Sequence, residues 1–312
     1  MSKVWNFYEN YYRIKDDLSE RNDLVKKRPV AFADLHTHSS ASDGTLTPAQ
    51  LVEKAESIGL SALAITDHDT ISGVKEALKA SENRNIKVIA GTELSCGNPG
   101  DEKSVHVLGL FITAEKSKLS EILDEQRELR YTRALKILNL LRDQGFNMDE
   151  LEEWFISEPN RVLGRPHLAH YLEDKGYVKD FDEAFKKYLS SGCPAYVKKD
   201  YIEFKTAIDA IHDAGGLAII AHPGLIPNWD KTWDEIKDLP WDGIEAFYIE
   251  HREKDVIKFH EIAKERHIAS TGGSDYHGDY GKHLDRLGQG GLKEEQYKEL
   301  INFAKTRGIK YL

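Results

Sequence analysis

Histidine and carboxylate side chains recur along this chain where apolar runs end. His36 and His38 follow the apolar residues 30–33, and because alternate side chains of a β-strand share a face, both imidazoles can bind one metal ion. Asp43 offers an oxygen ligand in the next loop. Residues of the same types follow later: Asp67, His68, Asp69, Glu93, His106, His222, Asp275 and His277. Histidines with carboxylates and without cysteine suit zinc, manganese or iron, and so many ligands exceed the needs of one ion. The pattern therefore predicts a multinuclear metal site.

Any one of these histidines could instead be a core residue with ordinary hydrogen bonds. That alternative does not account for all of them at equivalent places in successive strand and helix units. A water shared between two divalent ions is acidified enough to exist as hydroxide near neutral pH, and the same ions neutralise phosphoryl oxygens during an in-line displacement. The pattern thus predicts phosphate-ester hydrolysis that needs no serine, cysteine or histidine nucleophile.

Alternating strands and helices are expected to position these residues. The predicted strands cover residues 30–35, 62–65, 86–90, 105–111, 217–221, 243–247 and 268–270. Helices are predicted between them, the first opening at Thr47-Pro48 and ending near Gly59, with later ones at 71–81, 201–214, 233–237, 253–266 and 294–306. This alternation predicts a parallel α/β sheet or barrel, in which clusters distant in sequence meet where the strands end.

The strands stop between residues 115 and 194, where helices are predicted at 117–144, 148–156, 166–175 and 181–189. We interpret residues 115–194 as a helical insertion, and as a lid or substrate subdomain of a barrel formed by 30–114 and 195–312. Arg165 and His167 lie at the start of one helix, where they could bind a phosphate oxygen, although a surface salt bridge is an equal alternative for Arg165. Arg130 and Arg133 are weaker candidates for a second phosphate. Residues 1–29 are expected to form a helical extension with a basic linker.

Composition narrows the class of protein. The chain has 312 residues, 40% of them hydrophobic, and a net charge of −10, which fits a soluble globular protein and argues against one that coats duplex nucleic acid. No secretory signal or membrane-spanning run is expected. Cys96 and Cys193 form no CxxC motif, which suits the reducing cytoplasm.

Together the motifs DLHTHSSASDG (34–44), ITDHDT (65–70), GTELSC (91–96), HVLGL (106–110), AHPG (221–224) and GGSDYH (272–277) resemble the signatures of the PHP (polymerase and histidinol phosphatase) domain family. The resemblance extends from about residue 30 to the C-terminus. It implies a distorted (β/α)7 barrel with three metal ions in its mouth. The insertion, with its segment 164–167, resembles that of bacterial metal-dependent phosphoesterases that act on nucleotide 3′,5′-bisphosphates and short RNA 5′ ends.

Carried onto this sequence, the resemblance assigns ligands to each ion. One ion would be held by His36, His38, Glu93 and Asp275; a second by Glu93, as a bridge, with His106 and His222; and a third by Asp43, His68 and His277. Asp67 would orient a histidine ligand, and Asp69 would belong to a loop or helix cap. Two alternatives remain: a histidinol-phosphate phosphatase with the same metals, and a non-catalytic scaffold, which predicts missing ligands, whereas none of the nine is missing.

Overall fold

The computed structural model describes residues 30–97, 105–113, 117–158, 161–278 and 286–310. The chain divides into two compact units, one containing Arg127–Lys199 and the other Pro29–Gln126 with Asp200–Leu312. We refer to them as the helical unit and the barrel unit. The helix predicted for residues 1–29 lies outside the described residues.

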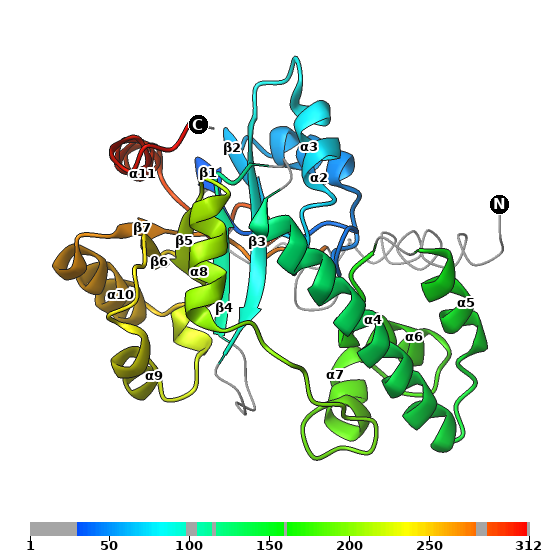
Figure 1. Ribbon diagram of the computed structural model, residues 1–312. Coiled ribbons are helices and arrows are strands. Elements are labelled where there is room, and N and C mark those ends of the chain that lie inside the picture. Colours follow the sequence, from blue (N-terminus) through cyan, green and yellow to red (C-terminus); the bar gives the residue numbers. More distant parts are fainter. Residues whose placement is uncertain (1–29, 98–104, 114–116, 159–160, 279–285, 311–312) are drawn as a thin grey trace. The chain divides into compact units, whose positions relative to one another are not determined.

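The barrel unit is built on a curled sheet of seven strands that lie side by side in the order of the sequence (Figure 1). The strands are β1 (Ala33–Asp34), β2 (Ala62–Ile65), β3 (Lys87–Cys96), β4 (Val105–Leu110), β5 (Leu217–Ile220), β6 (Gly243–Glu245) and β7 (Ala269–Thr271). Their core-facing residues are almost all without exposed surface. The predicted α/β class is confirmed.

Strand β4 departs from the predicted parallel arrangement, since it pairs antiparallel with both β3 and β5. The cause lies in the connection: only residues 97–104 join β3 to β4, and a parallel crossover needs a dozen or more residues. Reversal puts the start of β4 beside the end of β3, where His106 lies opposite Ser95. His106 therefore reaches the same end of the sheet as residues that follow the parallel strands.

The two edges of the sheet are joined beyond the ends of β1 and β7. The N–H of Leu35 donates to the carbonyl of Gly272 at 3.1 Å, and the N–H of Asp275 donates to the carbonyl of His36 at 2.9 Å. The buried carboxylate of Asp34 accepts hydrogen bonds from the N–H and the hydroxyl of Ser274 and from the N–H of Gly288, at 2.9, 2.6 and 2.9 Å. These bonds fix the segments after the two edge strands against each other.

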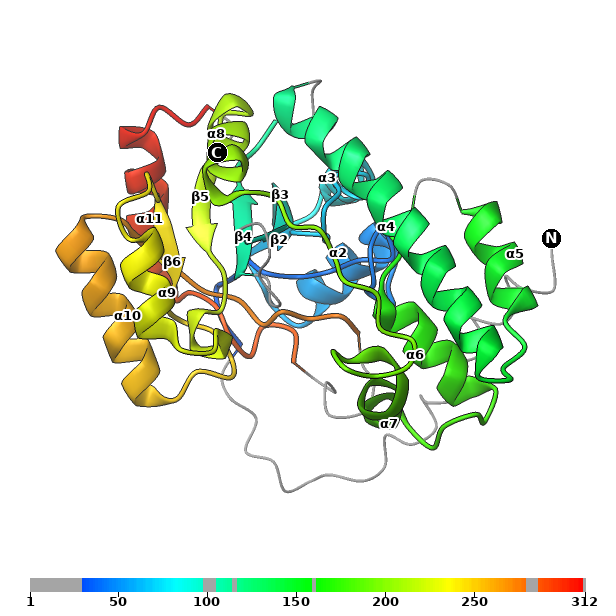
Figure 2. The same cartoon turned by 60° about the horizontal axis from the view of Figure 1, so that its bottom comes forward.

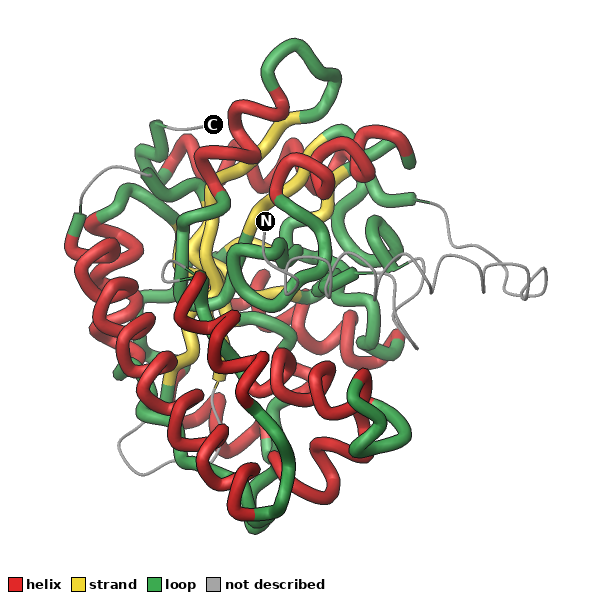
Figure 3. Tube along the Cα trace, turned by 90° about the vertical axis from the view of Figure 1, so that its right-hand side faces the viewer, coloured by secondary structure: helices red, strands yellow, loops and turns green. Residues whose placement is uncertain are grey.

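Helices pack on the sheet of the barrel unit (Figures 2 and 3). They are α2 (Pro48–Ser57), α3 (Val74–Ser81), α8 (Phe204–Asp213), α9 (Trp229–Ile236), α10 (Glu253–Arg266) and α11 (Glu294–Thr306), with a 3₁₀ turn η3 (Pro223–Leu225). Thr47 caps α2 as predicted, because its hydroxyl accepts from the N–H of Gln50 while the Gln50 side chain accepts from the N–H of Thr47. Helix α8 buries Ala207, Ile208 and Ile211 in the core it shares with β5.

The described part of the helical unit contains no strand, in agreement with its sequence. Helix α4 (Lys118–Asp143) begins in the barrel unit and ends in the helical unit. It is followed by α5 (Asp149–Ser157), α6 (Arg165–Asp174), α7 (Phe181–Ala184) and a π-helical turn η2 (Phe185–Leu189). Its own core includes Leu138, Phe155, Leu168 and Leu172. None of the described helices is long and apolar enough to cross a bilayer.

Replacing Asp34 by alanine should lower the free energy of unfolding by about 2–4 kcal/mol, because buried donors of Ser274 and Gly288 would lose their acceptor. Urea denaturation measures the change. Asp234→Ala is the control, since Asp234 is exposed and its ion pair with Lys237 should contribute less than about 1 kcal/mol. If Asp34→Ala were as stable as the wild type, Asp34 would not hold the sheet edges together.

Candidate metal centre

All nine predicted ligand residues lie in the barrel unit and meet at one end of its sheet. His36, His38 and Asp43 follow β1, His68 follows β2, Glu93 lies in β3, His106 in β4, His222 follows β5, and Asp275 and His277 follow β7. The backbone is strained at two of the ligand residues, since His222 and Asp275 have positive φ values of 29° and 51°. A side chain on Gly273 would place its Cβ 2.4 Å from that of His36, so the chain can approach His36 this closely only with glycine there.

The carboxylate of Glu93 lies at the centre of this cluster and has no exposed surface. Ring nitrogens of several histidines surround its two oxygens: those of His36, His106 and His222 lie 3.3, 2.9 and 3.1 Å from Oε1, and those of His38 and His68 lie 3.3 and 2.8 Å from Oε2. Each oxygen thus faces a different set of nitrogens. This is the arrangement that a carboxylate shared between two ions requires.

A second carboxylate, Asp43, faces the other side of the cluster. Its oxygens lie 3.4 Å from Nε2 of His277, 3.9 Å from Nε2 of His68 and 4.0 Å from Nδ1 of His38. His38 directs its other nitrogen, Nε2, toward Asp275 at 3.1 Å. The ring of His38 consequently lies between two groups of potential ligands.

Three groups of side chains bring their ligand atoms within 4.8 Å of one another: His36, His38, Glu93 and Asp275; His38, Asp43, His68 and His277; and His68, Glu93 and His106. The first group has the same members as one predicted ion site. The other two groups differ from the predicted division. His38 joins the group around Asp43, and the group that contains Glu93 and His106 is completed by His68 instead of His222. His222 still contacts Glu93.

The spacing and bonding of these atoms fit metal ions. Ligand atoms about 2.0–2.3 Å from one ion lie about 3–3.5 Å from each other, and most of the separations above fall near that range. Nε2 of His36, both ring nitrogens of His38 and Nδ1 of His222 are buried and form no hydrogen bond with any described residue. Buried polar atoms without partners are costly, so bound cations would remove a penalty that these nitrogens otherwise carry.

Electrostatics favour the ligand form of Glu93, Asp275 and His38, whereas neighbouring carboxylates outweigh burial and raise the pKa of His36, His222 and His277. Burial would raise the pKa of Glu93, but His106, His68 and His36 hold it well below its usual value. Asp275 is similarly ionised, since His36 and His277 outweigh the effect of burial on its pKa. Burial, together with His277 and His68, lowers the pKa of His38 to about 3, so its ring is neutral at physiological pH. The site therefore combines buried negative charge with a neutral imidazole that can donate electrons.

Two supporting residues were missed in the sequence. The buried carboxylate of Glu245, the last residue of β6, accepts from the N–H of His222 at 2.6 Å and lies 3.1 Å from Nδ1 of His36. The hydroxyl of Tyr248 donates to Oδ2 of Asp275 at 3.1 Å. Glu245 could have been noticed as a charged residue inside a short apolar strand, whereas Tyr248 leaves no comparable signal.

Two aspartates near His68 have bracing contacts. Asp67 accepts from the N–H and hydroxyl of Ser39 at 2.8 and 2.7 Å and from the hydroxyl of Ser42 at 2.6 Å, so it fixes the loop between His38 and Asp43. These contacts involve no histidine ring, and the predicted role of Asp67 in orienting a histidine ligand stays a prediction. Asp69 accepts from the N–H of Ser95 at 2.9 Å and has a φ of 50°, as suits a loop residue.

Arg165 and His167 lie in the helical unit, in the first turn of α6. Arg165 donates to the carbonyl of Leu189 at 3.1 Å, and its guanidinium lies 5.5 Å from the ring centre of Phe185. His167 is largely buried, and its Nδ1 accepts from the N–H of Gly164 at 3.2 Å. Their role in phosphate binding stays a prediction.

The fold and these side chains define a hydrolase, a metal-dependent phosphoesterase. The sequence profile of the PHP domain matches residues 34–306, so the chain belongs to the PHP domain family.

Two relatives agree with this assignment, and one solved structure shares the fold. The chain is 35% identical to a 5′-3′ exoribonuclease of Haemophilus influenzae, over 81% of this chain and 94% of that protein. It is 34% identical to a 3′,5′-nucleoside bisphosphate phosphatase of Chromobacterium violaceum, over 80% of this chain and 88% of that protein. It also resembles the structure of a protein of Chromobacterium violaceum described as an amidohydrolase, with a TM-score of 0.77 and 31% identity over 88% of this chain and 97% of the other. The motifs had already predicted the family.

Glu245→Gln should weaken metal binding by about 10–100-fold while the protein remains folded, because an amide cannot accept from both His36 and His222 as the carboxylate does. Equilibrium dialysis against buffered Mn²⁺ measures the affinity. Glu235→Gln, an exposed change on α9, should leave it unaltered. Equal affinities of the two variants would show that Glu245 does not position the ligands.

Proposed function

We propose that the nine clustered side chains hold three divalent ions, manganese, zinc or iron, and that the enzyme hydrolyses phosphate esters of small nucleotides. The substrates would be nucleoside 3′,5′-bisphosphates or the 5′ ends of short oligonucleotides. The observation that carries the metal-dependent reaction is the buried carboxylate of Glu93 with histidine nitrogens around both oxygens. The choice of substrate is supported by the two relatives above, whose names specify a bisphosphate phosphatase and an exoribonuclease.

We propose three ion positions, which the contacts among the nine side chains support. His36, His38, Glu93 and Asp275 would form the first; Glu93, His106 and His222 the second; and Asp43, His68 and His277 the third, with His38 and His68 close enough to contribute to a neighbour. Divalent ions in such a site polarise the phosphoryl oxygens and acidify the attacking water. The chain would then need no nucleophile of its own.

The residues around the ligands prepare them for this role. The carboxylate of Glu245 would accept a hydrogen bond from Nδ1–H of His36, which leaves Nε2 as the atom that faces Glu93 and Asp275. Tyr248 binds one oxygen of Asp275 and leaves the other, Oδ1, facing the histidines. Both contacts hold a ligand in one orientation before substrate arrives.

A division of labour between the two units is part of the proposal. The nine ligand residues all belong to the barrel unit, whereas Arg165 and His167 belong to the helical unit. Residues 115–194 would then select the substrate, and Arg165 and His167 would bind a phosphate oxygen of it, without a part in holding the metals. A guanidinium is suited to this because it can donate two parallel hydrogen bonds to phosphate.

The test is a substrate panel with Mn²⁺: nucleoside 3′,5′-bisphosphate, 5′-phosphorylated short RNA, histidinol phosphate and a phosphoribosyl 1,2-cyclic phosphate, the last because a relative of Eggerthella lenta, 30% identical, is named for that substrate. The first two should be hydrolysed fastest. Glu93→Gln should lower this rate by several orders of magnitude and reduce bound metal, since a neutral amide cannot offset the repulsion between two ions.

Glu261→Gln on the exposed side of α10 is the matched control for Glu93→Gln and should keep both rate and metal content. Preference for histidinol phosphate would replace the nucleotide proposal with the alternative phosphatase. A Glu93→Gln enzyme with full rate and metal would remove the bridging carboxylate from the mechanism, and a metal content of one ion or fewer per folded wild-type chain would contradict three sites.

Arg165→Ala should raise KM for a nucleotide substrate by about 10–100-fold, because one charge-assisted contact to phosphate would be lost, while metal content stays constant. Arg165→Lys should restore part of the loss. Steady-state kinetics, metal analysis and a thermal melt separate substrate binding from folding, since Arg165 also donates to Leu189. An unchanged KM would end the proposed phosphate role, and loss of metal would mean that the helical unit supports the cluster.

A further inference from the structure

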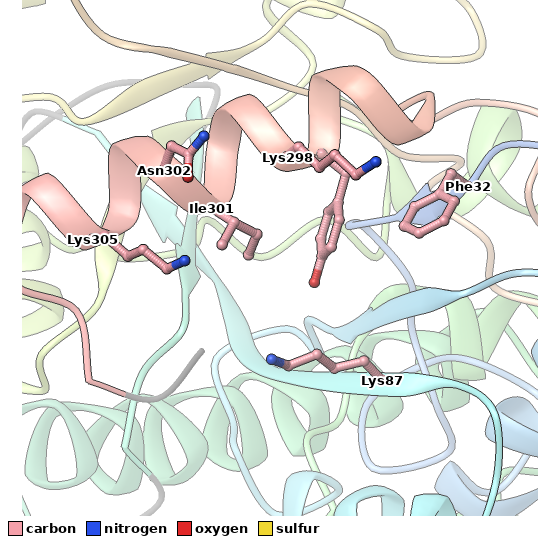
Figure 4. Close-up of a pocket in the computed structure, with 7 residues that line it drawn as sticks. Phe32, Lys87, Lys298, Ile301, Asn302 and Lys305 are labelled. Atoms are coloured by element: carbon pink, nitrogen blue, oxygen red, sulfur yellow. The ribbon is translucent and has the colours of Figure 1, made fainter.

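A pocket lies in the barrel unit at the opposite end of the sheet from the metal ligands. Helix α11 and the starts of two strands form this pocket of about 450 Å³, which is open to solvent. It is lined by Phe32, Lys87, Tyr297, Lys298, Ile301, Asn302 and Lys305 (Figure 4). Phe32 directly precedes β1, and Lys87 is the first residue of β3, whereas the metal ligands that belong to those strands come near or after their ends. Its volume lies within the range of small-molecule sites.

The wall of this pocket is apolar and partly aromatic. The rings of Phe32 and Tyr297 pack against each other with centres 5.5 Å apart and planes tilted by 42°, and Ile301 lies one turn further along α11 from Tyr297. Aromatic and aliphatic surfaces of this kind bind flat apolar rings. The wall would therefore accept a planar ring.

Two ammonium groups of the pocket are not neutralised. Lys298 forms an ion pair with Glu294 at 2.7 Å, but neither Lys87 nor Lys305 forms an ion pair with any residue that the structure describes. In Figure 4 the side chains of Lys87 and Lys305 extend into the space between β3 and α11. Because this chain is acidic overall, a pocket with two uncompensated lysines is a local excess of positive charge that favours an anion.

The hydroxyl of Tyr297 supplies a further polar contact. Tyr297 is nine-tenths buried, and its oxygen has no hydrogen-bond partner among the described residues. Burial raises the pKa of Tyr297 to about 12, so the hydroxyl keeps its proton at neutral pH. A buried donor without an acceptor is costly, and a ligand oxygen or ring nitrogen would satisfy it.

We propose that this pocket is a second ligand site, which binds a small anion carrying a planar ring, of the nucleoside monophosphate type. The ring would lie against Phe32, Tyr297 and Ile301, the phosphate would lie between Lys87 and Lys305, and the hydroxyl of Tyr297 would donate to the ligand. The proposal does not depend on the substrate assigned to the metal centre, because none of these residues belongs to it.

Calorimetric titration of AMP into the metal-loaded protein tests the proposal. The wild type should show an AMP-binding event that weakens about tenfold or more in Lys87→Ala/Lys305→Ala and about three- to tenfold in Tyr297→Phe. Lys254→Ala/Lys264→Ala removes the same charge from exposed positions of α10 and should leave the event unchanged. Adenosine and inorganic phosphate should each bind this site at least about tenfold more weakly than AMP.

Several results would overturn the proposal. AMP binding that is unaffected by loss of Lys87 and Lys305, or equally affected by loss of Lys254 and Lys264, would exclude a specific site. Phosphate binding as tightly as AMP would exclude a role for the ring. Any additional binding of AMP at the metal centre would be unaffected by loss of Lys87 and Lys305. A metal centre that does not accept nucleotides would therefore leave the event sensitive to Lys87 and Lys305 in place, so the two proposals fail separately.

Discussion

The burial of the Glu93 charge is the constraint on which the rest of this molecule depends. A carboxylate with no exposed surface is stable only if other groups replace the water it has lost. Here the replacement comes from histidines that follow or lie in several different strands, so no single segment could supply it. The curled sheet, its closure through Asp34 and the strained backbone at His222 and Asp275 all serve to hold these rings around one point.

Local sequence patterns were enough for most of the fold. Strand β2 and helices α10 and α11 have the predicted bounds, because each combines an apolar pattern with clear ends. Strand β1 is shorter than predicted. Residues 30–32 have apolar side chains, but the strand begins only at Ala33. The direction of β4 depends on the length of one connection, and strand periodicity is the same in both directions, so the alternation of elements could not reveal it.

In the candidate site, too, the sequence predicted residues that are recognised by their type and missed residues whose roles depend on contacts distant in the sequence. Ligand-type residues stand out by their chemical identity, and the nine predicted ones do meet in the structure. Glu245 and Tyr248 gain their roles only through contacts with His36, His222 and Asp275, which lie far away in the sequence. The pocket beside α11 was equally invisible, because an isolated Lys87 or Lys305 is indistinguishable from any solvated lysine until the fold brings them together.

The reversed strand β4 also bears on how this chain could change. Leu110 at the end of β4 pairs with Leu217 at the start of β5, and the segment Arg127–Lys199 of the helical unit is inserted in the sequence between these two neighbours in the sheet. The entropy of closing a loop grows only with the logarithm of its length, about 0.6 kcal/mol for each doubling. The barrel is therefore expected to tolerate a longer, shorter or unrelated segment at this position as long as Leu110 and Leu217 still pair. Evolution could exchange the inserted segment while the hydrolytic centre stays as it is.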